Sequence, residues 1–184
     1  MPVIARKIVL KDNRDAYRTF RTAVFVPIDG VDFEPYVKLL LAAPEGVRIA
    51  ERVVVVTDGD KTGGDDKQPP GQKRKRNLEQ LAKNLDAADR LEVFVNEVSL
   101  EPALVQAGNQ DLLKAVYLCL HRESEHNWDA AVANGGADQA AAVKGLFTNT
   151  RKGDFAQILA EVIENDEPFK VPPYLRDAIK AVVR

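Results

Sequence analysis

The sequence is short of cysteine. Cys119 is the one cysteine among 184 residues, which excludes a disulfide framework within the chain. A chain without internal disulfides is typical of a reducing compartment, so we expect a cytoplasmic protein. Because Cys119 lies in the apolar run 115–120, we expect it to be a small buried core residue. No apolar run is long enough to cross a membrane and the N-terminus has no signal-peptide pattern, so no membrane partner is expected.

A strong net charge is also missing. The formal net charge is −2, so any contact with nucleic acid must come from a local patch. The polar segment 61–76 offers such a patch, because it holds six basic residues against two acidic ones. We predict that this segment is a mobile loop and that its last basic residues contact DNA phosphates. These residues are Lys73, Arg74, Lys75 and Arg76. The alternative is a solvated basic turn at the start of a helix.

The run 52–60 is the most informative stretch that is present. Four consecutive valines predict a strand buried on both faces, as in a parallel sheet covered by helices. The strand delivers Asp58 and Asp60 to its carboxyl end, which is the edge where open α/β sheets bind ligands. Gly59 lets the backbone bend, so both carboxylates can converge on a hard cation such as Mg²⁺, Mn²⁺ or Ca²⁺. The alternative is an ordinary Asp-Gly turn.

The rest of the pattern predicts an α/β fold with a parallel sheet. Further strands are expected at 22–28 and 91–95, with a turn at Asp29-Gly30 and a loop or helix tail at 11–21. Helices are expected at 2–10, 33–43, 77–86, after Ser99, and at 111–121, 139–147, 155–163 and 174–183. Since the chain is helical from residue 111 onward, we divide it into an α/β domain at 1–107 and a helical subdomain at 108–184.

Polar residues also follow the strand at 91–95. Ser99 and Glu101 come after its carboxyl end, where they could join the two aspartates. They could equally cap the next helix, whose first turn favours a carboxylate. The histidines His121 and His126 are five residues apart with no third ligand nearby, so we do not expect zinc. Trp128 is expected to anchor the core.

Four stretches, taken in order, resemble the Toprim (topoisomerase–primase) region of the OLD (overcoming lysogenization defect) family of nucleases. They are residues 25–40, the valine strand with its Asp-Gly-Asp end, residues 99–104 with their Leu-Glu pair, and residues 152–179. The resemblance implies a Toprim-like parallel sheet flanked by helices and followed by a C-terminal helical subdomain. One departure is clear. The family's first strand, which carries a catalytic glutamate, is not found, and residues 2–10 look like the helix that would follow it.

The resemblance also implies a function, namely a divalent-metal-dependent DNA endonuclease that hydrolyses phosphodiesters with two metal ions. Mg²⁺ is the expected cofactor, or else Mn²⁺ or Ca²⁺. Catalysis would fall to Asp58, Asp60, Glu101 and Lys152, and metal binding to Asp58, Asp60, Ser99 and Glu101. Lys152 would neutralise charge on the scissile phosphate. The alternative for Lys152 is a solvent-exposed lysine at a helix start.

In the family the nuclease region follows an ATPase domain, and this sequence has no Gly-Lys-Ser/Thr phosphate loop. We therefore expect the nuclease fragment of a larger ATPase-nuclease, with DNA and the ATPase domain as partners and an oligomer allowed. Without the glutamate strand, the alternative is a catalytically incomplete Toprim fragment that serves as a DNA-binding or assembly module. Strand transfer through a tyrosine is disfavoured, because the tyrosines lack the context of a nucleophile. A phosphoacceptor domain is disfavoured by the Ser99–Glu101 pair and the helical C-terminal part.

Overall fold

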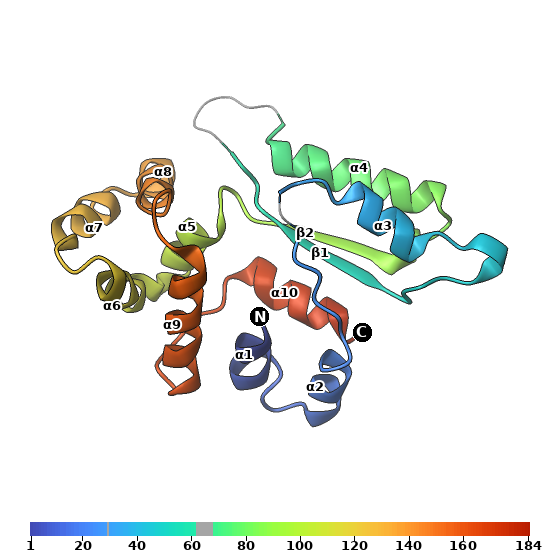
Figure 1. The fold of residues 1–184 in the computed structure, drawn as a ribbon, viewed down its shortest axis with the longest axis horizontal. Coiled ribbons are helices and arrows are strands. Elements are labelled where there is room, and N and C mark those ends of the chain that lie inside the picture. Colours follow the sequence, from blue (N-terminus) through green and yellow to red (C-terminus); the bar gives the residue numbers. More distant parts are fainter. Residues whose placement is uncertain (29, 62–67) are drawn as a thin grey trace.

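A small parallel sheet lies at the centre of the computed structural model, which describes residues 1–28, 30–61 and 68–184. Strand β1 (Val53–Thr57) pairs in parallel with β2 (Leu91–Val95), Val53 lying opposite Leu91. Within the described residues the sheet has these two strands. Parallel strands need a crossover connection, and α4 (Pro70–Asn84) supplies most of it (Figure 1). The predicted α/β fold with a parallel sheet is confirmed.

Helices cover both faces of this sheet (Figure 1). Val55 and Val93 point to one face because side chains alternate along a strand, and they pack with Val37 of α3 (Glu34–Leu41) and Leu78 of α4. The other face is covered by α10 (Pro173–Val182), which contacts both strands. The C-terminal helix thus belongs to the same packed unit as the sheet, although it lies inside the segment predicted as a helical subdomain.

A second core lies among the helices that follow the sheet. Trp128 is completely buried there, as expected for a core anchor, and its ring lies 5.4 Å from that of Tyr117. Phe147 packs edge-to-face on Phe155, with ring centres 4.8 Å apart. The helices that contribute to this core are α5 (Leu100–Leu104), the π-helical turn η4 (Val105–Asn109), α6 (Gln110–Leu120), α7 (Glu125–Val132), α8 (Gly136–Leu146) and α9 (Lys152–Glu164).

A third cluster joins the two ends of the chain. Ala5 and Phe20 pack against Ile179 of α10, and all three are buried. The N-terminal elements are α1 (Pro2–Ile4), the π-helical turn η1 (Ala5–Val9) and α2 (Arg14–Phe20); the short helical turns η2 (Pro44–Gly46) and η3 (Ala88–Arg90) flank the strands. Among the described residues, no helix has both the length and the apolar character needed to cross a membrane.

Two predictions about the N-terminal part were wrong. Residues 22–28 form no strand, because β1 takes its ladder bonds from β2 and residues 22–28 take part in no ladder. They run as an extended segment with Val24 86% exposed. Residues 11–21 are neither a loop nor the tail of the first helix, since the separate helix α2 forms there. Asn13 begins that helix by accepting a hydrogen bond from the Ala16 N–H at 2.9 Å, a cap that the sequence pattern did not bring out.

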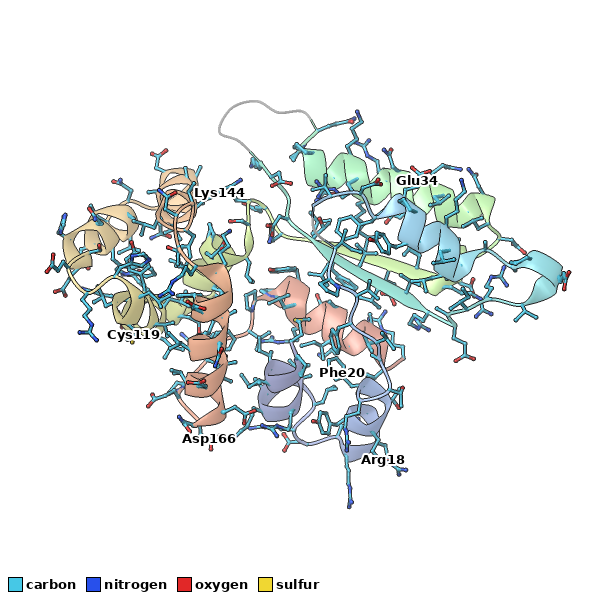
Figure 2. All side chains as sticks on the ribbon, viewed as in Figure 1. Arg18, Phe20, Glu34, Cys119, Lys144 and Asp166 are labelled. Carbon is cyan, nitrogen blue, oxygen red and sulfur yellow. The ribbon has the colours of Figure 1, made fainter. Side chains whose placement is uncertain are left out.

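Three further expectations need correction. Helix α4 begins at Pro70, so the basic residues 73–76 lie in its first two turns and not in a loop. The remainder of the predicted loop, 62–67, and residue 29 of the predicted turn lie outside the described residues. The valine strand is not buried on both faces, because Val56 is 36% exposed. Cys119 is exposed on α6, so it is not a core residue (Figure 2).

Candidate functional site

The loops after β1 and β2 are bonded to each other at the carboxyl edge of the sheet. The Asp60 N–H donates to the Val98 carbonyl at 3.0 Å, and the Lys61 N–H donates to the Glu97 carbonyl at 3.1 Å. On the other side, the Gly71 N–H donates to the Gly59 carbonyl at 2.9 Å. The Asp-Gly-Asp loop is therefore held between the exit of β2 and the first turn of α4.

Asp58 is held by a neighbouring amide. Asn96, the residue after β2, donates from Nδ2 to Asp58 Oδ1 at 2.7 Å and accepts the Gly59 N–H at 2.9 Å. Burial raises the pKa of the Asp58 carboxyl above its ordinary value, and the nearby charges of Glu101 and Asp60 raise it further. The Asn96 hydrogen bond and the charge of Lys152 oppose this shift. Asp58 therefore carries a negative charge that its surroundings disfavour.

Asp60 faces two basic side chains. Its backbone is in the left-handed region, with φ of 54°, a conformation that residues other than glycine adopt less often. Arg74 Nη2 lies 3.2 Å from Asp60 Oδ2, and the same guanidinium donates to Thr57 Oγ1 at 2.7 Å and to the Asp58 carbonyl at 3.0 Å. Lys144 approaches Asp60 from α8, one of the helices that follow the sheet, and its Nζ lies 3.9 Å from Asp60 Oδ1 (Figure 2).

Glu101 is buried and paired. Its Oε1 lies 2.9 Å from the Nζ of Lys152, the first residue of α9, whose side chain is 61% exposed. Ser99 is at the N-cap position of α5, yet its hydroxyl makes no capping bond. Ser99 is 4% exposed, and among the described residues its Oγ has no hydrogen-bond partner. A buried hydroxyl without a partner costs free energy, so Ser99 does not stabilise α5 as the capping residue that the sequence allowed.

The predicted residues separate into two groups. One group comes from the end of β1 and the starts of α5 and α9, and it comprises Asp58, Asp60, Ser99, Glu101 and Lys152. Charge interactions link its four ionisable members. The basic residues 73–76 have different surroundings. The guanidinium of Arg74 faces the acidic loop, Lys75 lies 3.8 Å from Glu79, and Lys73 and Arg76 are exposed. The DNA contacts of all four remain a prediction.

Sequence reasoning missed three residues of this site. Asn96 could have been found from its position, because it directly follows a strand at the ligand-binding edge of the sheet. Tyr174 of α10 reaches the same amide, with its hydroxyl 3.4 Å from Asn96 Nδ2, and burial raises its pKa to about 12. Lys144 gave no local signal, because only the packing of α8 brings it to the site.

The side chains offer the right chemistry for a hard divalent cation. Two aspartates, a glutamate and the Ser99 hydroxyl all offer oxygen ligands, and a cation beside Asp58 would favour the charged form of a carboxyl whose pKa is raised by burial and by the charges of Glu101 and Asp60. In the described part of the chain, however, no three His, Cys, Asp or Glu side chains are grouped closely enough to hold a metal ion. Arg74 and Lys152 each occupy one carboxylate instead. A cation would therefore have to displace these contacts.

A pocket of about 620 Å³ opens beside the acidic loop. Asp58 and Asp60 contribute polar groups to its wall, but most of the lining is apolar and includes Phe33, Val56 and Leu159. The pocket joins the sheet edge to α1 and α9. It gives the carboxylates a surrounding of low polarity, consistent with the effect of burial on Asp58.

A parallel sheet covered by helices, with acidic residues at the carboxyl ends of its strands, matches the architecture expected of a Toprim-like α/β domain. The solved structure of the C-terminal region of the Burkholderia pseudomallei OLD protein has a similar fold, with a TM-score of 0.61 and 24% sequence identity. The similarity covers 97% of this chain and 91% of that one. No protein-family model and no curated protein matches the chain. The predicted resemblance is thus confirmed at the level of the fold.

Proposed function

We propose that this chain hydrolyses DNA phosphodiesters with divalent cations held at the carboxyl ends of β1 and β2. The observation that carries the proposal is the meeting of Asp58, Glu101 and Lys152 at the carboxyl edge of the sheet. The fold shared with the C-terminal region of an OLD protein supports it. Oxygen ligands of this kind select Mg²⁺, Mn²⁺ or Ca²⁺.

The proposed roles follow from the positions of the side chains. Asp58, Asp60 and Glu101 would hold the cations, with Ser99 as a further oxygen donor. Bound divalent cations supply Lewis-acid stabilisation of the attacking and leaving oxygens of a phosphodiester. Lys152 is mostly exposed and pairs with Glu101, so it can leave that carboxylate and neutralise a scissile phosphate. Arg74, whose side chain is 12% exposed, would hold the loop that carries Asp60 in place through its ion pair with that carboxylate.

A second candidate function rests on those same ion pairs. Arg74 and Lys152 neutralise two of the acidic groups without any metal. A domain with this arrangement could bind DNA or assemble with a partner and cleave nothing. Metal-dependent cleavage separates the two functions.

Nicking of supercoiled plasmid tests the proposal directly. We expect the native chain to convert supercoiled to open-circular DNA with Mg²⁺ or Mn²⁺ and to lose this activity in EDTA. Lys152→Ala should lower the rate roughly 10²-fold, because it removes one positive charge from the transition state. Lys83→Ala, at an exposed position in the last turn of α4, is the matched control and should keep the native rate. Absence of metal-dependent nicking by the native chain, with DNA binding retained, would favour the binding module.

DNA affinity measured against salt tests the basic patch. We propose that Lys73 and Arg76 contact the DNA backbone, because both are exposed in the first two turns of α4 beside the acidic loop. Lys73→Ala/Arg76→Ala should reduce the slope of log K against log[salt] by roughly 2, since each neutralised phosphate contributes about 0.9. The control, Arg14→Ala/Arg18→Ala, removes two exposed charges from α2, on the opposite side of the molecule (Figure 2). An equal loss of slope in both variants would show that these residues act only through overall charge.

A further inference from the structure

The structure points to Asn96 as a positioning residue that acts through Asp58. This inference rests on the proposed metal site and adds to it a residue that touches neither metal nor substrate. Asn96 is 7% exposed, directly follows β2, and bonds to groups on two other segments of the chain. We propose that its side-chain amide fixes which oxygen of Asp58 is offered to a cation.

The orientation of the amide follows from its partners. The Gly59 N–H is a donor, so the atom that faces it at 2.9 Å must be the Asn96 oxygen. The Asn96 nitrogen then faces Asp58 Oδ1 at 2.7 Å and the Tyr174 hydroxyl at 3.4 Å. No rotation of the amide by 180° satisfies these contacts, because it would set the carbonyl oxygen against a carboxylate. The assignment of oxygen and nitrogen is therefore fixed by chemistry.

The same partners explain why an asparagine is needed. A side chain at this position must accept from the Gly59 backbone and donate to the Asp58 carboxylate at the same time. An aspartate there would accept twice and repel Asp58, and a leucine of similar shape would do neither. A charged acceptor makes the hydrogen bond to Asp58 the stronger of the two.

The consequence concerns the free oxygen of Asp58. Because Oδ1 already accepts from the amide, the proposal assigns Oδ2 as the oxygen offered to a cation, with the hydrogen bond fixing the orientation of the carboxylate. Groups that orient a metal ligand in this way typically change metal affinity or activity about 10–100-fold when they are removed. Asn96 also joins three segments in one contact, since Tyr174 lies on α10 and Asp58 after β1.

Mn²⁺ binding, followed by electron paramagnetic resonance, tests the inference without any need for activity. In the full chain, Asn96→Ala should raise the Mn²⁺ dissociation constant about tenfold. It should also alter the spectrum of bound Mn²⁺, which reports the arrangement of its ligands. Asn96→Ser is a milder second variant for the case in which alanine does not fold. Its single hydroxyl is too short to serve both partners, so a severalfold weakening is expected.

Asn109→Ala is the matched control. Asn109 is also buried and also bonds through both ends of its amide, donating to the carbonyls of Leu104 and Lys170 and accepting the Lys170 N–H. Its loss should lower stability and leave the affinity and spectrum of Mn²⁺ unchanged in the folded fraction. Native-like Mn²⁺ binding by both Asn96 variants, or equal weakening in Asn109→Ala, would overturn the role of Asn96 alone. A native chain that binds no Mn²⁺ would contradict the proposed function and, with it, this inference.

Discussion

Replacing Gly59 by alanine should unfold the domain or come close to doing so. A Cβ on Gly59 would lie 2.2 Å from the Asn96 carbonyl oxygen and 2.3 Å from that of Glu97. Both are backbone atoms at the exit of β2, so neither can turn aside as a side chain could. We expect a loss of about 4 kcal/mol or more of the free energy of unfolding, which is a large part of the total for a domain of this size.

Urea unfolding followed by circular dichroism measures this loss. Gly145→Ala is the control, because a Cβ there meets nothing within 4 Å and the residue lies within α8. That change should stabilise the chain by about 0.5–1 kcal/mol, since alanine favours a helix over glycine. A Gly59→Ala variant with a native urea midpoint would mean that the two loops are not in contact as described.

Asp58→Asn should have the largest effect on activity. The asparagine keeps the shape of the side chain and an oxygen for the Asn96 amide, but it removes the charge that would hold a cation. If the proposed function holds, plasmid nicking should fall about 10³-fold, which corresponds to the several kcal/mol that a metal ion contributes. Mn²⁺ binding should weaken in parallel. Asp177→Asn, an exposed residue of α10, is the control and should leave both quantities unchanged.

The same variant should be more stable than the native chain near neutral pH. The pKa of Asp58 is raised in the folded state, so the folded chain holds this proton more tightly than the unfolded chain does. The native protein therefore loses stability as the pH rises from the ordinary pKa of 3.8 through the raised one. The amide introduced by Asp58→Asn cannot titrate, so the advantage of the variant should be small in acid and grow with pH. A variant that is less stable than the native chain at neutral pH would show that the charge of Asp58 stabilises the fold.

The sequence was sufficient for the elements whose pattern is local. The strands at 53–57 and 91–95 and the helices α6, α8, α9 and α10 stand out through β-branched runs and helical periodicity, whereas α7 was not predicted. The paired ends of the strands placed Asp58 and Glu101 on one edge. The start of α4 was misjudged, because a basic, polar stretch without apolar spacing resembles a loop. Its helical state comes from Pro70 at the first position and from Gly71 bonding to Gly59.

Contacts between distant segments could not be predicted from the sequence. The residues that flank Arg74 in the sequence are basic and polar, so they indicated a surface cation. The structure instead turns its guanidinium inward to Thr57 and Asp60. The strand predicted at 22–28 failed for a related reason. Its residues have strand propensity, but a strand also requires a partner edge, and propensity alone does not provide one. Lys144 likewise enters the site only through the packing of α8.

The contact between Asn96 and Tyr174 has a consequence for how the site forms during folding. Asp58 is separated by 38 residues from Asn96, and Asn96 by 78 residues from Tyr174. The contact from Tyr174 can form only when α10 packs against the sheet, which brings together segments that are far apart along the chain. The complete set of contacts around Asn96 is therefore a product of the whole fold, and local folding of the two strands and α4 alone does not supply it.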